Sequence, residues 1–130
     1  MSVDTKPLVS IITPSFNSGD FLEEAVRSVI AQDYSPLEHI IVDGGSTDET
    51  LEILQRYNSK PVTWVSEPDE GQADAINKGF RRAQGEIIGW LNADDTYQPG
   101  AIRSAVAYLQ AHPEVEQART NVGWVVAACD

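Results

Sequence analysis

Hydrophobic and polar positions follow two alternating rhythms along the chain. Short apolar runs rich in β-branched residues predict strands, at residues 8–13, 39–43, 61–65, 86–91 and 122–128. Between these runs, apolar residues recur at helical spacing and predict helices, at residues 21–31, 51–57, 73–83 and 101–111. Alternation of strands with helices is typical of an α/β protein whose mostly parallel sheet carries helices on both faces. The sequence therefore predicts this fold class.

Local signals suggest where several of these elements begin and end. Pro14 is expected to stop the first strand, because proline cannot donate a hydrogen bond to a strand ladder. Two capping-box spacings, Ser46 with Glu49 and Asp69 with Gln72, predict where the second and third helices open.

The apolar run at residues 86–91 is expected to form a strand buried on both faces, followed by two adjacent acids, Asp94 and Asp95. Right-handed connections place the carboxyl ends of parallel strands at one edge of a sheet, where open α/β proteins bind ligands. Three loops should meet at this edge, and they comprise residues 14–18, 43–47 and 92–96. An Asp-Asp pair alone is a common turn or helix cap. Its convergence with the other two loops favours a binding site instead.

The composition narrows the ligands that this edge would bind. A chain of 130 residues fits one domain, residues 1–130, and its 9 basic and 20 acidic residues give a net charge of −11, which argues against nucleic acid. Neither a P-loop nor a G-x-G-x-x-G turn occurs, so an ATPase or a dinucleotide binder is not favoured. An acid pair without a basic cluster suggests a hard divalent cation, Mg²⁺ or Mn²⁺, held by one or two carboxylates and by substrate phosphates.

Other polar residues allow two interpretations each. Asp43 ends a different strand and is expected to accept a hydrogen bond from a base or a sugar hydroxyl, but a turn acid before Gly44 fits its spacing equally well. Lys78, Arg81 and Arg82 are candidates for phosphate contacts, although a solvated helix face is favoured.

The sequence also bears on the compartment. Its single cysteine, Cys129, excludes an internal disulfide and a cysteine-built metal site, and we expect an inert thiol. No segment approaches the roughly 20 apolar residues of a membrane span, and Met1–Pro7 lacks the apolar core of a signal peptide. A cytoplasmic protein with no membrane span is expected.

Four linked motifs stand in order along the chain, namely Ser10–Asn17 (SIITPSFN), Val42–Asp48 (VDGGSTD), Ser66–Gln72 (SEPDEGQ) and Asn92–Asp95 (NADD). Together with Asn77-Lys78-Gly79 and Gln98-Pro99-Gly100, they resemble the family 2 glycosyltransferases, which have the Rossmann-like GT-A fold. The resemblance runs from residue 8 to about residue 114.

The resemblance implies that the chain binds a nucleotide-diphosphate sugar, usually a UDP or GDP sugar, and transfers the sugar to an acceptor hydroxyl with inversion. It implies that base and ribose are held by the first motif, that Asp43 reads the base, and that the metal lies on Asp95 first and Asp94 second. The residues implied to bind the nucleotide sugar are Thr13, Pro14, Phe16, Asn17, Asp43, Gly71, Gln72, Asn77, Asn92 and Asp94. For Asn77, a solvated helix position is an equally good interpretation.

Two departures from the family pattern limit this expectation. Asn92 and Gly44 stand where many members have aspartate, and an amide brings no charge to a metal. The chain also ends where members continue into a half that binds the acceptor and supplies an Asp or Glu base. We therefore expect a truncated GT-A fold with no assigned catalytic base. The alternative is a non-catalytic nucleotide-sugar or metal-binding module. An unpaired sheet edge and apolar surface would also favour a homodimer.

Overall fold

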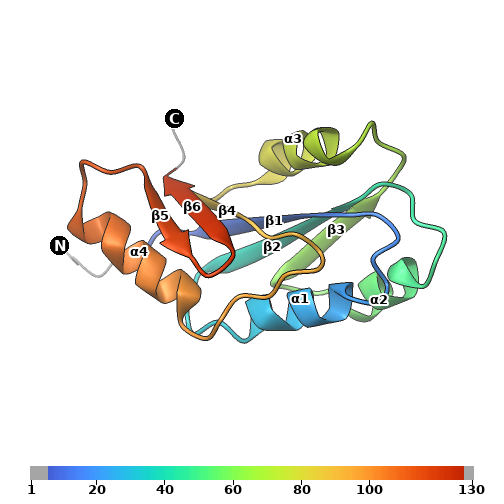
Figure 1. The fold of residues 1–130 in the computed structure, drawn as a ribbon, viewed down its shortest axis with the longest axis horizontal. Helices are drawn as coiled ribbons and strands as arrows, with labels where there is room; N and C mark the ends of the chain where they lie inside the picture. Colours follow the sequence, from blue (N-terminus) through green and yellow to red (C-terminus); the bar gives the residue numbers. More distant parts are fainter. Residues whose placement is uncertain (1–5, 128–130) are drawn as a thin grey trace.

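The computed structural model describes residues 6–127, which form a six-stranded sheet with helices on both faces (Figure 1). The strands are β1 (Val9–Ser15), β2 (Leu37–Asp43), β3 (Val62–Ser66), β4 (Ile87–Trp90), β5 (Gln117–Thr120) and β6 (Gly123–Ala127). The helices are α1 (Leu22–Ile30), α2 (Thr50–Arg56), α3 (Gln72–Arg82) and α4 (Ala101–Ala111). Strands β1 to β4 run parallel within the order β3-β2-β1-β4-β6-β5, whereas β6 is antiparallel to β4 and β5. The predicted α/β class with a mostly parallel sheet is confirmed.

The predicted elements are all present, with ends that differ from the prediction by at most two residues. The expectation that Pro14 stops the first strand is wrong, because β1 continues through Pro14 to Ser15. The pairing of β1 with β4 ends at Ile12 and Trp90, so only β2 pairs with β1 at Pro14. A proline is tolerated in such an edge section. Ala128 and Cys129, named in the predictions, lie outside the described residues.

Both predicted capping boxes are wrong. Neither α2 nor α3 has a side-chain hydrogen bond at its N-cap. The Ser46 hydroxyl instead donates to the Asp43 carboxylate, and the Gln72 amide donates to Asn92 Oδ1. Asp69 accepts from the Gly71 backbone, ahead of the helix. The side chains whose spacing fits a cap therefore have other partners, which are local for Ser46 and Asp69 and tertiary for Gln72.

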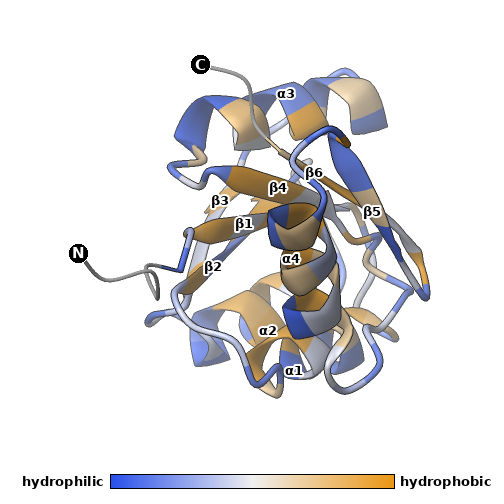
Figure 2. Cartoon of the chain, turned by 90° about the vertical axis from the view of Figure 1, so that its left-hand side faces the viewer, coloured by the Kyte–Doolittle hydropathy of each residue, from blue (hydrophilic) through white to orange (hydrophobic). Residues whose placement is uncertain are grey.

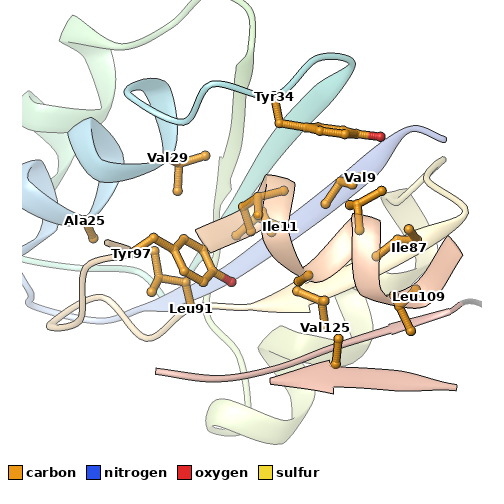
Figure 3. Packing of buried hydrophobic residues seen from close by; sticks show 14 residues of the cluster. Val9, Ile11, Ala25, Val29, Tyr34, Ile87, Leu91, Tyr97, Leu109 and Val125 are labelled. Atoms are coloured by element: carbon orange, nitrogen blue, oxygen red, sulfur yellow. The ribbon is translucent and has the colours of Figure 1, made fainter. Parts of the chain in front are cut away.

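Helices α1, α2 and α4 cover one face of the sheet, and α3 covers the other (Figures 1 and 2). On the first face, apolar residues of β1, β4 and β6 pack against α1 and α4 in the cluster shown in Figure 3. Residues of β2 pack against α1 and α2 in a second cluster. On the second face, Ala75 of α3 packs on Ile40 and Val42 of β2. Helix α3 lies close to β1, since a Cβ placed on Gly79 would overlap Ile12 Cγ2.

Helix α3 lies over β1 and β2 and leaves part of its face of the sheet open. The run at residues 86–91 was expected to be buried on both faces, but Trp90 is 45% exposed. No helix in residues 6–127 covers β4 and β6 beside α3. Phe80, Trp90 and Trp124 instead line an open groove of about 470 Å³. In the same part of the chain, none of the helices has the length and apolar character needed to span a bilayer.

Candidate functional site

Hydrogen bonds tie together the loops after β1 and β2. The backbone N–H of Asn17 donates to Ser46 Oγ at 2.8 Å, and the Thr47 N–H donates back to Asn17 Oδ1 at 2.8 Å. Asn17 has a φ of 48°, in the left-handed region that asparagine tolerates better than most residues. Gly44 N–H also donates to the Ser15 carbonyl at 2.8 Å. The structure thus gives the Asn17 side chain a structural role, holding one loop against the next.

The carboxylate of Asp43 lies at the end of β2 and is fully buried. It accepts hydrogen bonds from Ser46 N–H at 2.8 Å, Ser46 Oγ at 2.6 Å, Ser66 Oγ at 2.8 Å and Gly45 N–H at 3.2 Å. These bonds make Asp43 the acid that fixes the turn, one of its two predicted roles. Since Asp43 is 0% exposed, a nucleotide base could contact it only if the loop that covers it moved away.

Thr13 is also buried, and its hydroxyl pairs with His39 Nε2 at 2.7 Å on the neighbouring strand. Complete burial lowers the pKa of His39 to about 3, because the surroundings do not solvate an imidazolium. The imidazole is therefore neutral at physiological pH. The Thr13 side chain belongs to the sheet interior, and Thr13 does not line the pockets at the sheet edge.

A pocket of about 490 Å³ lies at the carboxyl edge of β1 and β2. Its lining residues come from three chain segments and are Pro14, Ser15, Phe16, Gly44, Asp69, Gly71, Gln72 and Ala75. Phe16 is 60% exposed, so its ring is available to a ligand. A concave, mostly apolar pocket with an aromatic side chain and a few polar groups suits a planar ligand such as a nucleotide base.

The NADD segment forms a turn that leaves both acids available. Asp95 N–H donates to the Asn92 carbonyl at 3.0 Å, and Asn92 Oδ1 accepts from Gln72 Nε2 at 2.8 Å and Trp90 Nε1 at 2.9 Å. Within residues 6–127, no hydrogen bond reaches the carboxylate of Asp94 or Asp95. Asp94 is exposed and Asp95 partly so. The turn interpretation is therefore correct, and it is compatible with a binding role.

A second pocket, of about 330 Å³, connects this turn to the first pocket. It is lined by residues that include Asn17, Asn92 and Asp94, and it shares Pro14 and Gln72 with the first pocket. Part of the predicted convergence of three loops is therefore observed as two adjoining pockets along one edge of the sheet.

The acid turn fits a divalent cation of a particular kind. In the described part of the chain, no three His, Cys, Asp or Glu side chains converge on a point where they would hold an ion. Asp94 and Asp95 thus offer two carboxylates without protein partners. Mg²⁺ and Mn²⁺ prefer oxygen ligands, and Mg²⁺ commonly takes one or two carboxylates with phosphates and water. The donor set fits such an ion only when a phosphorylated ligand completes it.

Helix α3 contributes less than its sequence suggested. Asn77 is exposed and lines neither pocket. Lys78 Nζ lies 3.2 Å from Glu67 Oε1 and 3.8 Å from Asp74 Oδ2, so it fastens the loop before α3. Arg81 and Arg82 are exposed, as expected for a solvated face.

Four residues that line the first pocket were not predicted as binding residues from the sequence, namely Ser15, Gly44, Asp69 and Ala75. Ser15 lies in the loop at residues 14–18 that was expected at this edge, but it was not named as a binding residue. For Asp69 a signal was present in the SEPDEGQ motif, where it was interpreted only as a helix cap.

Comparisons with known proteins agree with this geometry. Residues 10–126 match the family described as Glycosyl transferase family 2. The chain is 40% identical over 108 residues to the putative teichuronic acid biosynthesis glycosyltransferase TuaG of Bacillus subtilis, covering 80% of this chain and 42% of that protein. It is 39% identical over 113 residues to an uncharacterized glycosyltransferase of Mycobacterium tuberculosis, covering 85% of this chain and 43% of that protein. The chain thus spans less than half the length of these relatives.

Two solved structures resemble the fold closely. The mannosyltransferase PcManGT of Pyrobaculum calidifontis, in complex with GDP-Man and Mn²⁺, superposes with a TM-score of 0.78 at 33% identity, covering 88% of this chain and 35% of that one. Staphylococcus aureus TarS, in complex with UDP-GlcNAc, gives a TM-score of 0.76 at 27% identity, covering 84% of this chain and 32% of that one.

Proposed function

Because the chain belongs to glycosyl transferase family 2, we propose that it binds a UDP or GDP sugar and transfers the sugar to an acceptor hydroxyl with inversion. The observation that carries the proposal is the pair of adjoining pockets at the sheet edge. One is flanked by the exposed Phe16 ring, and the other by the free carboxylate of Asp94. The complexes of PcManGT with GDP-Man and of TarS with UDP-GlcNAc support this class of donor.

Asp95, with Asp94 second, is proposed to hold Mg²⁺ or Mn²⁺. Such an ion, when bound, would stabilise the negative charge of the nucleoside diphosphate as it leaves. The protein's own part is to present two carboxylates that accept no hydrogen bond within residues 6–127, on a turn closed by the bond from Asp95 N–H to the Asn92 carbonyl. Asn92 holds that turn through Gln72 and Trp90, and brings no charge of its own. The Mn²⁺ in the PcManGT structure supports this proposal.

The residues that bind the nucleotide divide into two groups under this proposal. Pro14, Phe16, Gly71 and Gln72 line the first pocket and would contact the base and ribose directly. Thr13, Asn17 and Asp43 would act by shaping the loops, since their side chains are engaged with other parts of the protein. Asn77 stays a prediction of the sequence pattern.

No catalytic base is assigned, because a base must reach the acceptor hydroxyl and the position of the acceptor is not known. The alternative function, a donor-binding module without turnover, is therefore kept. One observation is compatible with it, the open groove at Trp90 and Trp124, where another part or partner would be needed to cover the face of the sheet. The name of the relative TuaG supports a part in assembling a cell-envelope polysaccharide.

Titration calorimetry of UDP-GlcNAc and GDP-mannose, with and without Mn²⁺, tests the proposal alongside an assay for released nucleotide. Metal-dependent binding of a nucleotide sugar, with release of the nucleotide when an extract containing acceptors is added, supports a transferase. Binding without release in any condition supports the module. No binding of either sugar, with or without metal, contradicts both functions.

We also propose that two copies of the chain associate through the same open groove. A second copy would cover apolar surface that the chain itself leaves exposed, at Phe80, Trp90 and Trp124. Sedimentation velocity at increasing concentration measures it, and a monomer at all concentrations contradicts it.

A further inference from the structure

We propose that Asp69, rather than Asp43, reads the base of the donor by accepting a hydrogen bond from a ring N–H of uracil or guanine. The inference rests on the proposed nucleotide-sugar binding and names the group that selects the nucleotide. Asp69 lies in the loop between β3 and α3 and lines the first pocket.

The space around Gly44 places the Asp69 carboxylate in the pocket. A Cβ built on Gly44 would lie 2.8 Å from Asp69 Oδ2 and 3.0 Å from Oδ1. The carboxylate of Asp69 therefore occupies the room that a side chain at position 44 would need. Both residues line the same pocket, so the absence of a side chain at Gly44 lets a carboxylate from another loop enter.

One oxygen of Asp69 is anchored and the other is available. Oδ1 accepts from the Gly71 N–H at 3.0 Å, which orients the carboxylate. Within residues 6–127, no hydrogen-bond donor reaches Oδ2. Gly71 has a φ of 114°, a conformation that L side chains rarely adopt, and nothing lies within 4 Å of its Cβ direction. The loop thus presents an oriented carboxylate oxygen beside open space.

Asp43 differs from Asp69 in every one of these respects. It is fully buried, and both of its oxygens accept hydrogen bonds from loop and strand residues. Because Asp43 is 0% exposed, a base could reach its carboxylate only if the loop that covers it opened, and this would leave buried donors without partners, which is costly. Asp69 needs no such exchange.

The chemistry of the bases decides what a carboxylate selects here. Uracil carries a ring N–H at N3, and guanine carries one at N1 beside its exocyclic amine, so both donate to a carboxylate. Cytosine and adenine have an unprotonated, accepting nitrogen at the corresponding ring position, which a carboxylate repels. Asp69 therefore favours uridine and guanosine nucleotides over cytidine and adenosine nucleotides.

Calorimetric titration of the full chain in Mn²⁺ with UDP, GDP, CDP and N3-methyl-UDP tests the inference. Asp69→Asn is expected to lower the affinity for UDP and GDP about ten- to a hundredfold. This is the effect of losing a hydrogen bond to a charged group. The variant should also discriminate less between UDP or GDP and CDP, because the amide of asparagine can donate a hydrogen bond to cytosine N3. Wild-type protein should bind N3-methyl-UDP about as weakly as Asp69→Asn binds UDP.

Glu70→Gln is the matched control, since it removes the same charge from the next residue, which does not line the pocket. It should bind UDP like the wild type. Equal UDP affinity for Asp69→Asn and Glu70→Gln overturns the inference, while Mn²⁺-dependent binding would leave the proposed function standing. Equal affinity of wild-type protein for UDP and N3-methyl-UDP overturns it without any variant. Failure of the wild type to bind any nucleotide overturns both.

Discussion

The two sides of β1 differ in how completely the protein covers and fastens them. On the side of β2 and β3, helices cover both faces of the sheet, and the loops at the edge exchange hydrogen bonds through Asn17, Ser46 and Asp43. On the side of β4, β6 and β5, the face beside α3 is bare within residues 6–127, and Trp90 and Trp124 are 45% and 47% exposed.

The two sides of β1 therefore have different tasks. We call the side of β2 and β3 the fastened side, and the side of β4, β6 and β5 the open side. The fastened side forms the first pocket, whose geometry depends on loops that hydrogen bonds hold together without a ligand. The open side adjoins the acid turn through Trp90, whose indole N–H donates to Asn92 Oδ1. Under the proposed function, the fastened side would hold the donor. The predictions below test whether the two sides differ in this way.

Gly79→Val is expected to have the largest effect on stability, because it changes a closely packed position on the fastened side. The new side chain would collide with Ile12, which is 1% exposed in the sheet. Overpacking of this kind should lower the free energy of unfolding by about 3 kcal/mol, measured by urea denaturation. The control is Asn77→Val on the exposed surface of the same helix, expected to cost less than about 1 kcal/mol. Equal effects of the two variants would show that α3 does not depend on close packing.

Asp95→Ala should abolish the dependence of nucleotide binding on Mn²⁺ and leave the fold intact. The carboxylate has no protein partner within residues 6–127, so its loss breaks no internal bond. We expect UDP affinity in Mn²⁺ to fall at least about tenfold, or about 1.4 kcal/mol, and to match the affinity without metal. Glu114→Ala, which removes an exposed carboxylate away from both pockets, is the control. An unchanged metal response in Asp95→Ala would mean that the ion lies elsewhere.

The features predicted correctly from the sequence are those that depend on residues close together along the chain. Helical and strand periodicity identifies nine of the ten elements in residues 6–127. The parallel direction of the strands correctly predicts that the NADD turn lies at the carboxyl edge of the sheet. Strand β5 was missed because Gln117–Thr120 has only one buried residue, Ala118, and therefore no apolar pattern. Its antiparallel pairing with β6 defines it as a strand, and this depends on the tertiary fold.

The fine structure of the site was less predictable for a related reason. Ser46 and Gln72 fit local caps by spacing, but Ser46 donates to Asp43 within its own loop and Gln72 donates to Asn92 of another loop. Asp43 fits a base reader and a turn acid equally well by spacing, and its four hydrogen bonds support the role in the turn. The position of Asp69 depends on Gly44, a residue 25 positions earlier, and no local pattern records such a contact.

The stability of the fastened side should depend on pH through His39. Burial lowers its pKa from the ordinary value of 6.5 to about 3, so the folded protein keeps it neutral while the unfolded chain takes up a proton below pH 6.5. This contribution to stability is complete above pH 6.5 and is lost as the pH falls toward 3. The free energy of unfolding should drop by about 1 kcal/mol between pH 7 and pH 5.5. His39→Gln should flatten this slope in urea titrations; an unaltered slope would assign it to other groups.

Trp124→Ser is expected to have the smallest effect, because it changes the open side. Its ring is 47% exposed and touches the Arg119 guanidinium, 5.5 Å from the ring centre. Loss of a half-exposed ring and a surface cation–π contact should lower the free energy of unfolding by less than about 1 kcal/mol in urea denaturation. The affinity for UDP in Mn²⁺ should stay unchanged, since Trp124 lines neither of the two pockets at the carboxyl edge of the sheet. A loss as large as that of Gly79→Val would show that the groove is packed as tightly as the fastened side, and the contrast between the two sides would not hold.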